Sequence, residues 1–366
     1  MKYLGHKDYS HSSPEKTGLL VTNLGTPEAP TAPALRKYLA EFLWDPRVVE
    51  IPRPIWWLIL NLIILRIRPK KSAAAYEKVW TAEGSPLMTY TRAQCAGIKQ
   101  QFEKQGLSHL EVEFAMRYGQ PSIESALLKL QEKNVSKLLV LPLYPQYAGS
   151  TTGSTFDAIA HTFTKLRWTP ELRFVQKYAA HDEYISACAE QIQNHWQTHG
   201  RNEKLIFSFH GVPKRYLLAG DPYHCQCHKT ARLIVEKLQL SDDQWMTTFQ
   251  SRFGREEWLQ PYTDKTMEKL GKQGIRSVDI FCPGFSSDCV ETLEEIDMEN
   301  REIFIQAGGT DFSYIPALNA DEAHIKALAQ IALEHMQGWP AADCNYVHME
   351  VDEQCQMRAI ARGAKQ

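Results

Sequence analysis

The chain has 366 residues, of which 43% are hydrophobic and 23% charged, and its 41 basic and 43 acidic side chains leave a formal net charge of −2. This composition is typical of a globular protein and excludes a disordered chain. The balanced charge excludes the broad basic surface of a nucleic-acid-binding protein, so we expect no nucleic-acid partner. The polar first residues do not resemble a signal peptide, and we expect a cytoplasmic protein with free thiols.

Apolar runs rich in β-branched residues predict eight strands, at 18–24, 111–118, 137–143, 172–175, 205–210, 246–250, 278–282 and 312–315. Helical patterns lie between them, at 34–43, 92–103, 122–132, 155–166, 182–197, 230–238, 264–270, 291–305 and 323–336. Strands joined by helical crossovers form parallel sheets. We therefore predict an α/β protein with two Rossmann-like halves, each a four-stranded parallel sheet flanked by helices. The halves are 17–175 and 176–337, followed by a C-terminal extension at 338–366.

The most apolar segment, IWWLILNLIILRI at 55–67, is about 13 residues long. Because a bilayer-spanning helix needs roughly 20 apolar residues, it is too short to cross a membrane. Two interpretations remain open. The segment is either a buried core helix or an exposed apolar lip that touches a membrane surface or a large flat apolar ligand. The second is favoured by the cations that follow, namely Arg66, Arg68, Lys70 and Lys71.

Polar side chains gather where the predicted strands end, which is where open α/β sheets bind ligands. His210 ends one strand and precedes Gly211, and imidazole is both a base near neutral pH and the commonest metal ligand. The helix that follows the strand at 278–282 carries Glu291, Glu295 and Glu299 at a spacing of four, on one helical stripe. Such a row suits a divalent cation or a proton path, although a solvated acidic face has the same pattern. No G-x-G-x-x-G, Walker A, H-E-x-x-H or paired C-x-x-C pattern is present.

In eight motifs, taken in order, the chain resembles the ferrochelatases, which insert ferrous iron into a porphyrin: NLGTP, GSPL, MRYGQPSI, LPLYPQYAGSTTGS, SFHGVP, GDPYHCQC, FQSRFGREEWLQPYTD and CPGFSSDCVETLEEID. The resemblance implies a porphyrin cleft between the halves and the conversion of protoporphyrin IX and Fe²⁺ into protoheme with release of two protons. His210 and Glu291 correspond to the catalytic pair, and His210, Glu291, Glu295 and Glu299 to the groups that meet the metal. The expected substrate-binding residues are Leu24, Arg68, Tyr76, Ser85, Tyr118, Tyr144, Ser150, Trp258 and Phe285.

No cofactor is required by this resemblance, and Fe²⁺ is a substrate. An iron–sulfur cluster is not expected, because Gly149 stands at the internal cysteine position of the animal relatives and the tail has only Cys344 and Cys355. The pair Cys225 and Cys227 lacks matching partners. Because 55–67 is apolar with basic residues beside it, and the product heme is poorly soluble, we also expect the enzyme to touch the inner membrane surface reversibly through this segment. The alternatives are a coproporphyrin ferrochelatase or another tetrapyrrole metal chelatase, and a non-catalytic porphyrin or heme binding protein.

Overall fold

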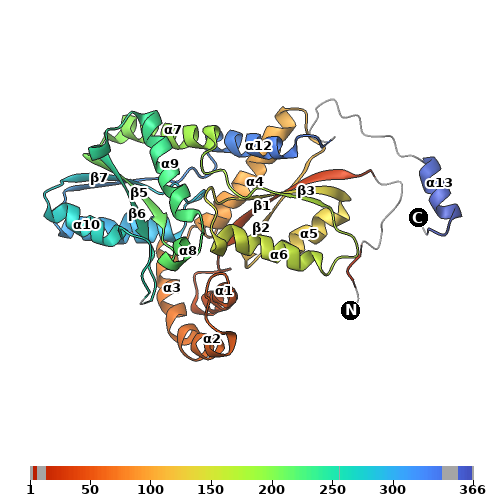
Figure 1. The fold of residues 1–366 in the computed structure, drawn as a ribbon, viewed down its shortest axis with the longest axis horizontal. Coiled ribbons are helices and arrows are strands. Elements are labelled where there is room, and N and C mark those ends of the chain that lie inside the picture. The colour runs from red at the N-terminus through yellow and green to blue at the C-terminus, as the bar shows by residue number, and fades with distance from the viewer. Residues whose placement is uncertain (1–2, 6–13, 255, 340–352, 365–366) are drawn as a thin grey trace.

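The computed structural model describes residues 3–5, 14–254, 256–339 and 353–364, and its described part contains two four-stranded parallel sheets (Figure 1). The strands of the first sheet follow the order β2-β1-β3-β4, and those of the second follow β6-β5-β7-β8. The two orders are the same pattern repeated, which confirms the prediction of two similar Rossmann-like halves. The strands are β1 (Lys16–Gly25), β2 (Glu111–Tyr118), β3 (Val135–Pro142), β4 (Glu171–Phe174), β5 (Lys204–His210), β6 (Trp245–Gln250), β7 (Ser277–Phe281) and β8 (Asp311–Ile315).

Both faces of each sheet are covered by helices, which explains the nearly continuous apolar runs of the strands. One face of the first sheet packs on α5 (Ile123–Glu132) and α6 (Ser154–Phe163), and the other on α4 (Pro86–Lys104) and α12 (Glu322–Met336). One face of the second sheet packs on α7 (Asp182–His199) and α9 (Tyr223–Leu238). Its other face packs on α10 (Thr263–Lys272), η4 (Glu291–Asn300) and α11 (Arg301–Gln306).

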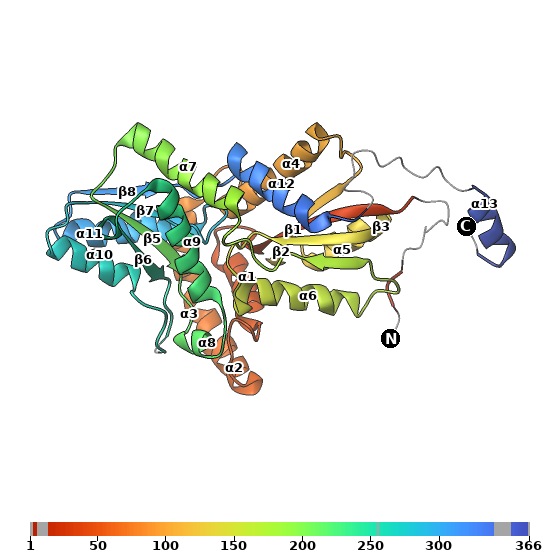
Figure 2. The same ribbon diagram turned by 45° about the horizontal axis from the view of Figure 1, so that its top comes forward.

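A single hydrophobic core runs through both halves, along the side covered by α4, α12, α7 and α9 (Figure 2). It includes Leu19 and Ile98 from the first half and Phe207 and Leu328 from the second, all fully buried. Helix α12 follows the last strand of the second sheet and packs on α4 of the first half. The predicted boundary near residue 176 therefore separates two sheets that share a core.

The first helices form a separate bundle that projects from the sheets, built from α1 (Ala32–Trp44), α2 (Arg53–Ile59), the π-helix η1 (Leu60–Ile64) and α3 (Leu65–Val79) (Figure 1). One stripe of the apolar segment 55–67 packs into this bundle. Trp56 is 3% exposed, Leu60 2% and Leu65 4%, and the Trp56 indole donates a hydrogen bond to the Leu43 carbonyl at 2.7 Å. The interpretation of 55–67 as a core helix is therefore correct for this stripe alone.

The opposite stripe of the segment is exposed and apolar. About half or more of the surface of each residue is accessible, at Ile55, Trp57, Leu58, Leu62, Ile63 and Ile67, which are 49–68% exposed. We call these six residues the lip. Arg66, next to Ile67, and Lys70 and Lys71, which follow the lip along the chain, are also exposed. No helix in the described part of the chain is long and apolar enough to cross a bilayer.

The remaining short elements are η2 (Gly149–Gly153), α8 (Lys214–Leu218), η3 (Asp242–Gln244) and α13 (Glu353–Ala361). Helix α13 was not predicted, because the tail has no clear apolar period. Residues 340–352 of the predicted C-terminal extension, including Cys344, lie outside the described residues. The predicted helix at 230–238 begins earlier than expected, at Tyr223, so both Cys225 and Cys227 lie on α9.

Candidate active site

His210 ends β5 with its imidazole held in one orientation. The Nδ1 atom lies 2.7 Å from the carbonyl oxygen of Gly211. Because a carbonyl only accepts, Nδ1 carries the proton in the neutral ring and the lone pair lies on Nε2. The ring of Phe285 lies near the imidazole, with 6.5 Å between the ring centroids. A base or metal ligand with a fixed tautomer is thus presented at the carboxyl end of a central strand.

Gly211 allows the chain to turn directly after this histidine. Its N–H donates to the carbonyl of Gln250 at 2.8 Å, which extends the β5–β6 ladder by one bond. A Cβ atom at this position would lie 2.8 Å from that same carbonyl oxygen and 3.2 Å from the Trp258 ring. The glycine is therefore required by the close approach of strand β6 and the segment that contains Trp258.

The acidic helix η4 is a π-helix followed by the short α-helix α11, and the prediction of one continuous α-helix over 291–305 is wrong. Side-chain amides hold two of its carbonyl groups. Gln250 Nε2 donates to the Glu291 carbonyl at 2.8 Å, and Asn300 Nδ2 donates to the Glu295 carbonyl at 2.8 Å. These bonds favour the wider π turn, a feature that often occurs at functional sites. The Gln250 bond also attaches η4 to the end of β6, which pairs with the strand of His210.

The Glu295 carboxylate is fixed by the residue that follows β6. Ser251 donates to it from its backbone N–H at 2.7 Å and also from its hydroxyl. Ser251 adopts a left-handed conformation with φ of 63°, which directs both donors toward η4. Burial raises the pKa of Glu295, the Ser251 and His210 interactions lower it, and the neighbouring Glu291 raises it. Glu295 is therefore electrostatically linked to both members of the expected catalytic pair.

The carboxylate row continues from this buried region to the surface. Glu299 is exposed, and its pKa is raised by partial burial and by Glu294, against the lowering effect of Lys71 and Lys78. Glu294 is 8% exposed and forms an ion pair with Lys78 of α3 at 2.7 Å. No pattern in the sequence distinguishes Glu294 from the neighbouring carboxylates. This pair joins the acidic helix to the bundle that carries the lip.

Three tyrosines from the first half share an electrostatic environment with Glu291. Burial raises the pKa of Tyr38, Tyr76 and Tyr144 well above the ordinary value, and the Glu291 carboxylate raises it further. The Tyr38 hydroxyl donates to the Gly25 carbonyl at 3.1 Å, and the sequence did not single out this residue. The Tyr144 hydroxyl and the Trp258 indole N–H are both buried and have no hydrogen-bond partner among the described residues.

Two of the predicted pocket residues have structural roles in the first half. Tyr118 is fully buried, and its hydroxyl donates to Asp45 at 2.8 Å. Arg117 also donates to Asp45, and the Ser154 hydroxyl binds the same carboxylate oxygen. Ser85 is 2% exposed and caps the amino end of α4. Tyr118 and Ser85 therefore hold neighbouring elements in place, and no surface of Tyr118 is open to a ligand.

The remaining predicted residues are partly exposed. Leu24 packs against the bundle core at the end of β1, and Ser150 lies in the π-helix η2. Arg68 stacks on the Phe253 ring, with the guanidinium carbon 4.5 Å from the centroid, and burial lowers the pKa of Arg68. No hydrogen bond or ion pair joins Arg68 to any residue that the structure describes. A half-buried cation without a carboxylate partner is suited to an anionic ligand group.

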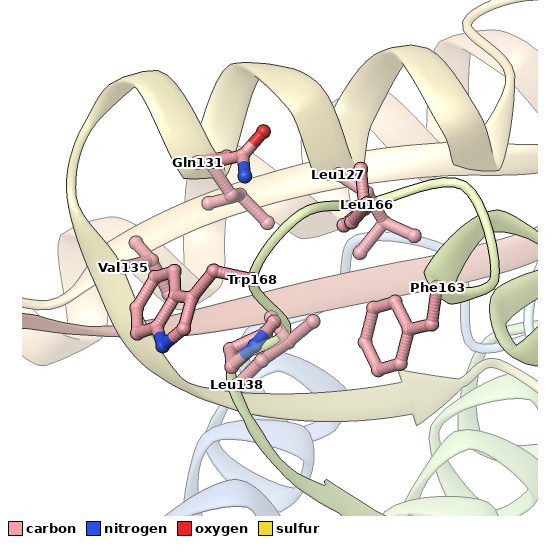
Figure 3. Close-up of a pocket in the computed structure, with 9 residues that line it drawn as sticks. Leu127, Gln131, Val135, Leu138, Phe163, Leu166 and Trp168 are labelled. Atoms are coloured by element: carbon pink, nitrogen blue, oxygen red, sulfur yellow. The ribbon is translucent and has the colours of Figure 1, made fainter. Parts of the chain in front are cut away.

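A cavity in the first half lies away from these residues (Figure 3). It is enclosed by α5, β3 and the segment after α6, and Figure 3 shows Leu127, Phe163 and Trp168 around it. Its volume of about 10 Å³ suits roughly one water molecule. It is therefore far too small for a porphyrin.

Comparison with known proteins decides the family. The model named Ferrochelatase matches residues 16–336. A protein named ferrochelatase from Marinobacter nauticus is 60% identical over 93% of this chain and 92% of its own length. This chain belongs to the ferrochelatase family. A second ferrochelatase, from Thioalkalivibrio sulfidiphilus, is 56% identical over the full length of both chains. The resemblance inferred from the motifs is confirmed, and the protein is an enzyme of this family.

Solved structures support the ferrochelatase fold independently of sequence. The structure of SirB from Bacillus subtilis with Fe³⁺ covers 91% of this chain and 100% of its own, with a TM-score of 0.50 and 12% sequence identity. At this identity the likeness concerns the fold alone. It agrees with the repeated parallel sheets described above.

For a ferrochelatase the iron is a substrate, so a closed metal site is not needed. Within the described ranges, no group of three or more His, Cys, Asp or Glu side chains is placed to hold a metal ion. The buried free cysteines in those ranges are Cys95, Cys188, Cys227, Cys282 and Cys289, and Cys225 is exposed. Burial raises the pKa of the Cys227, Cys282 and Cys289 thiols well above the ordinary value, which disfavours the thiolate form that binds metals.

Proposed function

We propose that this chain is a protoporphyrin ferrochelatase, which inserts Fe²⁺ into protoporphyrin IX, releases two protons and forms protoheme in the terminal step of heme biosynthesis. Family membership and relatives that are 52–60% identical and named ferrochelatase support this proposal. The observation that carries it is the imidazole of His210. Its Nδ1 atom is bonded to the Gly211 carbonyl, no hydrogen bond joins its Nε2 atom to a residue that the structure describes, and its interaction with Glu295 lowers the pKa of that carboxyl group.

The reaction must remove two pyrrole N–H protons while iron forms four bonds to nitrogen. His210 and Glu291 are the proposed catalytic pair and the first groups to meet the metal or the protons. Glu295 lies next along the row, and its raised pKa brings proton exchange closer to neutral pH than for a free carboxyl group. Glu299, at the exposed end, connects the row to solvent. In this proposal Fe²⁺ enters as a substrate and no resident cofactor is required.

We propose that the porphyrin binds between the lip and the carboxyl ends of the strands. The aromatic side chains of Tyr76, Tyr144, Trp258 and Phe285 suit a flat apolar macrocycle. The unpartnered Arg68 guanidinium suits one propionate. Leu24 and Ser150 complete the proposed binding set. Ser85 and Tyr118 contribute by holding α4 and the bundle in position.

The function is tested by mixing the purified protein with Fe²⁺ and either protoporphyrin IX or coproporphyrin without oxygen. Loss of porphyrin fluorescence together with heme absorbance is expected, and faster turnover of protoporphyrin is expected. Faster turnover of coproporphyrin would assign the protein to the alternative ferrochelatase class. Porphyrin binding without metallation would indicate a carrier and contradict the proposal.

We further propose a cytoplasmic enzyme that touches the inner membrane surface reversibly through the lip. The exposed apolar side chains and the cations Arg66, Lys70 and Lys71 are the pattern of an interfacial helix on anionic lipid. Cosedimentation with vesicles containing phosphatidylglycerol should fall strongly for a Trp57→Ser/Leu62→Ser variant. Trp168→Ser is the matched control, because Trp168 is 45% exposed and lies in the first half outside the lip. Absence of wild-type cosedimentation at low salt would contradict this proposal.

A further inference from the structure

Helix α9 carries a pair of histidines outside the site described above. His224 and His228 are four residues apart, so both lie on one face of the helix. Their ring centroids are 4.5 Å apart, and both residues are half-buried. Neither ring has a hydrogen bond or an ion pair with any residue in the described ranges. The nitrogens of two adjacent imidazoles are thus available to a ligand.

A buried aromatic ring holds both imidazoles in place. His224 stacks on Phe249 with 5.7 Å between the centroids, and His228 meets the same ring edge-on at 5.9 Å. Phe249 is 1% exposed and belongs to β6. The two imidazoles therefore rest on a rigid strand, which reduces the conformational entropy that a bound ligand must remove.

The protonation state of the pair also favours metal binding. Burial lowers the pKa of both imidazoles, and the neighbouring His224 lowers the pKa of His228 further. The neutral form, which has a free nitrogen lone pair, therefore predominates at neutral pH. Both pKa shifts follow from the location of the rings against Phe249 and agree with the geometry.

We propose that His224 and His228 form a second transition-metal site, in which one nitrogen of each imidazole binds a cation such as Zn²⁺. Two histidines at this spacing on one helical face are the arrangement by which H-E-x-x-H helices bind zinc. Imidazole ligands suit Zn²⁺, Cu²⁺, Ni²⁺ and Fe²⁺.

The site is open and exchangeable. The described residues supply no group of three ligands able to hold a metal, so water completes the coordination shell. Among the residues that the structure describes, neither histidine has a partner that fixes its second nitrogen, and such partners typically strengthen metal binding 10–100-fold. A closed structural zinc site has four protein ligands, whereas this site has two and no supporting partners among the described residues.

The strand β6 separates this pair from the catalytic residues. Side chains alternate along a strand, so Phe249 faces α9 and Gln250 faces η4. Gln250 accordingly binds the Glu291 carbonyl, and its register partner is His210. A cation on α9 therefore lies on the opposite face of the sheet from Glu291, and its binding does not depend on the proposed function.

A second histidine pair on α7 provides a matched control. His195 and His199 have the same spacing, and their centroids are 4.3 Å apart. In that pair His195 Nε2 is bonded to the Ser313 hydroxyl at 2.7 Å, and His199 Nδ1 lies 3.2 Å from the His195 carbonyl. Each ring thus keeps one nitrogen that could bind a cation of its own, so removing this pair tests whether a zinc equivalent belongs to α9 or to α7.

The test is Zn²⁺ binding by equilibrium dialysis on porphyrin-free protein carrying Cys225→Ser, which removes the exposed thiol next to His224. The His224→Gln/His228→Gln variant should lose about one bound Zn²⁺ per chain, and either single substitution should weaken that site at least tenfold. The His195→Gln/His199→Gln control should keep the α9 equivalent with its affinity unchanged, even where it loses a separate zinc equivalent of its own. Unchanged stoichiometry and affinity in the α9 variant, or loss of the same equivalent in the α7 control, would overturn the proposal.

Discussion

The hydroxyl of Ser251 offers a direct way to perturb the carboxylate row without removing a carboxylate. Replacing Ser251 by alanine deletes one of the two hydrogen bonds from this residue to Glu295. A hydrogen bond to a charged group contributes about 1.5–3 kcal/mol. Losing this hydrogen bond destabilises the ionised carboxylate of Glu295 and so raises its pKa. Because one pKa unit corresponds to about 1.36 kcal/mol, the rise of activity on the acidic side of the pH profile should move upward by roughly 1–2 pH units.

The pH profile should move upward because the ionised carboxylate of Glu295 is the form that accepts a proton. If turnover requires ionised Glu295, activity rises with pH through the pKa of Glu295, and a higher pKa shifts that rise to higher pH. The assay is the pH dependence of kcat for iron insertion between about pH 5 and 9. Ser251→Gly is the control for backbone strain, because glycine accepts the left-handed φ of 63° and keeps the N–H donor. If the pH profiles of both variants match that of the wild type, Glu295 has no part in proton transfer.

Three further substitutions test the packing around the site and within the bundle. Gly211→Ala should lower the free energy of unfolding by about 1–3 kcal/mol and reduce kcat, because its Cβ would lie 2.8 Å from the Gln250 carbonyl oxygen. An unchanged thermal melting temperature would contradict the close approach of β6 at this position. In urea unfolding, Trp56→Ser should lower the free energy of unfolding by about 3–5 kcal/mol, whereas Trp57→Ser should change it by less than about 0.5 kcal/mol. Equal losses of stability in the two variants would refute the assignment of buried and exposed stripes.

The strands of this protein are predictable because each is covered on both faces. All eight predicted strands occur within two residues of their expected bounds. Residues Leu205 and Phe207 face one core and Ile206 faces another, so the run is apolar throughout and has no alternation to misread. The position of His210 was predictable for the same reason, because His210 is the last residue of the predicted strand at 205–210.

Other features depend on contacts that no local pattern records. The π-helix η4 is favoured by the Gln250 and Asn300 amides, and Gln250 is 41 residues from its carbonyl partner. The ion pair of Glu294 with Lys78 joins residues 216 positions apart. The segment 55–67 is apolar except at Asn61 and Arg66, so its sequence could not reveal that Trp56 is buried and Trp57 exposed. For that reason the lip can be assigned only from the packing of α1 and α3.

The most direct test of the central claim compares iron insertion and porphyrin binding in His210→Ala. This variant is expected to melt close to the wild type and still to bind protoporphyrin IX, as followed by quenching of protein fluorescence. Heme formation from protoporphyrin IX and Fe²⁺ without oxygen should fall by at least about a hundredfold, because a positioned acid–base group typically contributes 10²–10⁴-fold. A folded His210→Ala protein that makes heme at a rate near that of the wild type would contradict the assignment of His210 as the catalytic base or metal ligand.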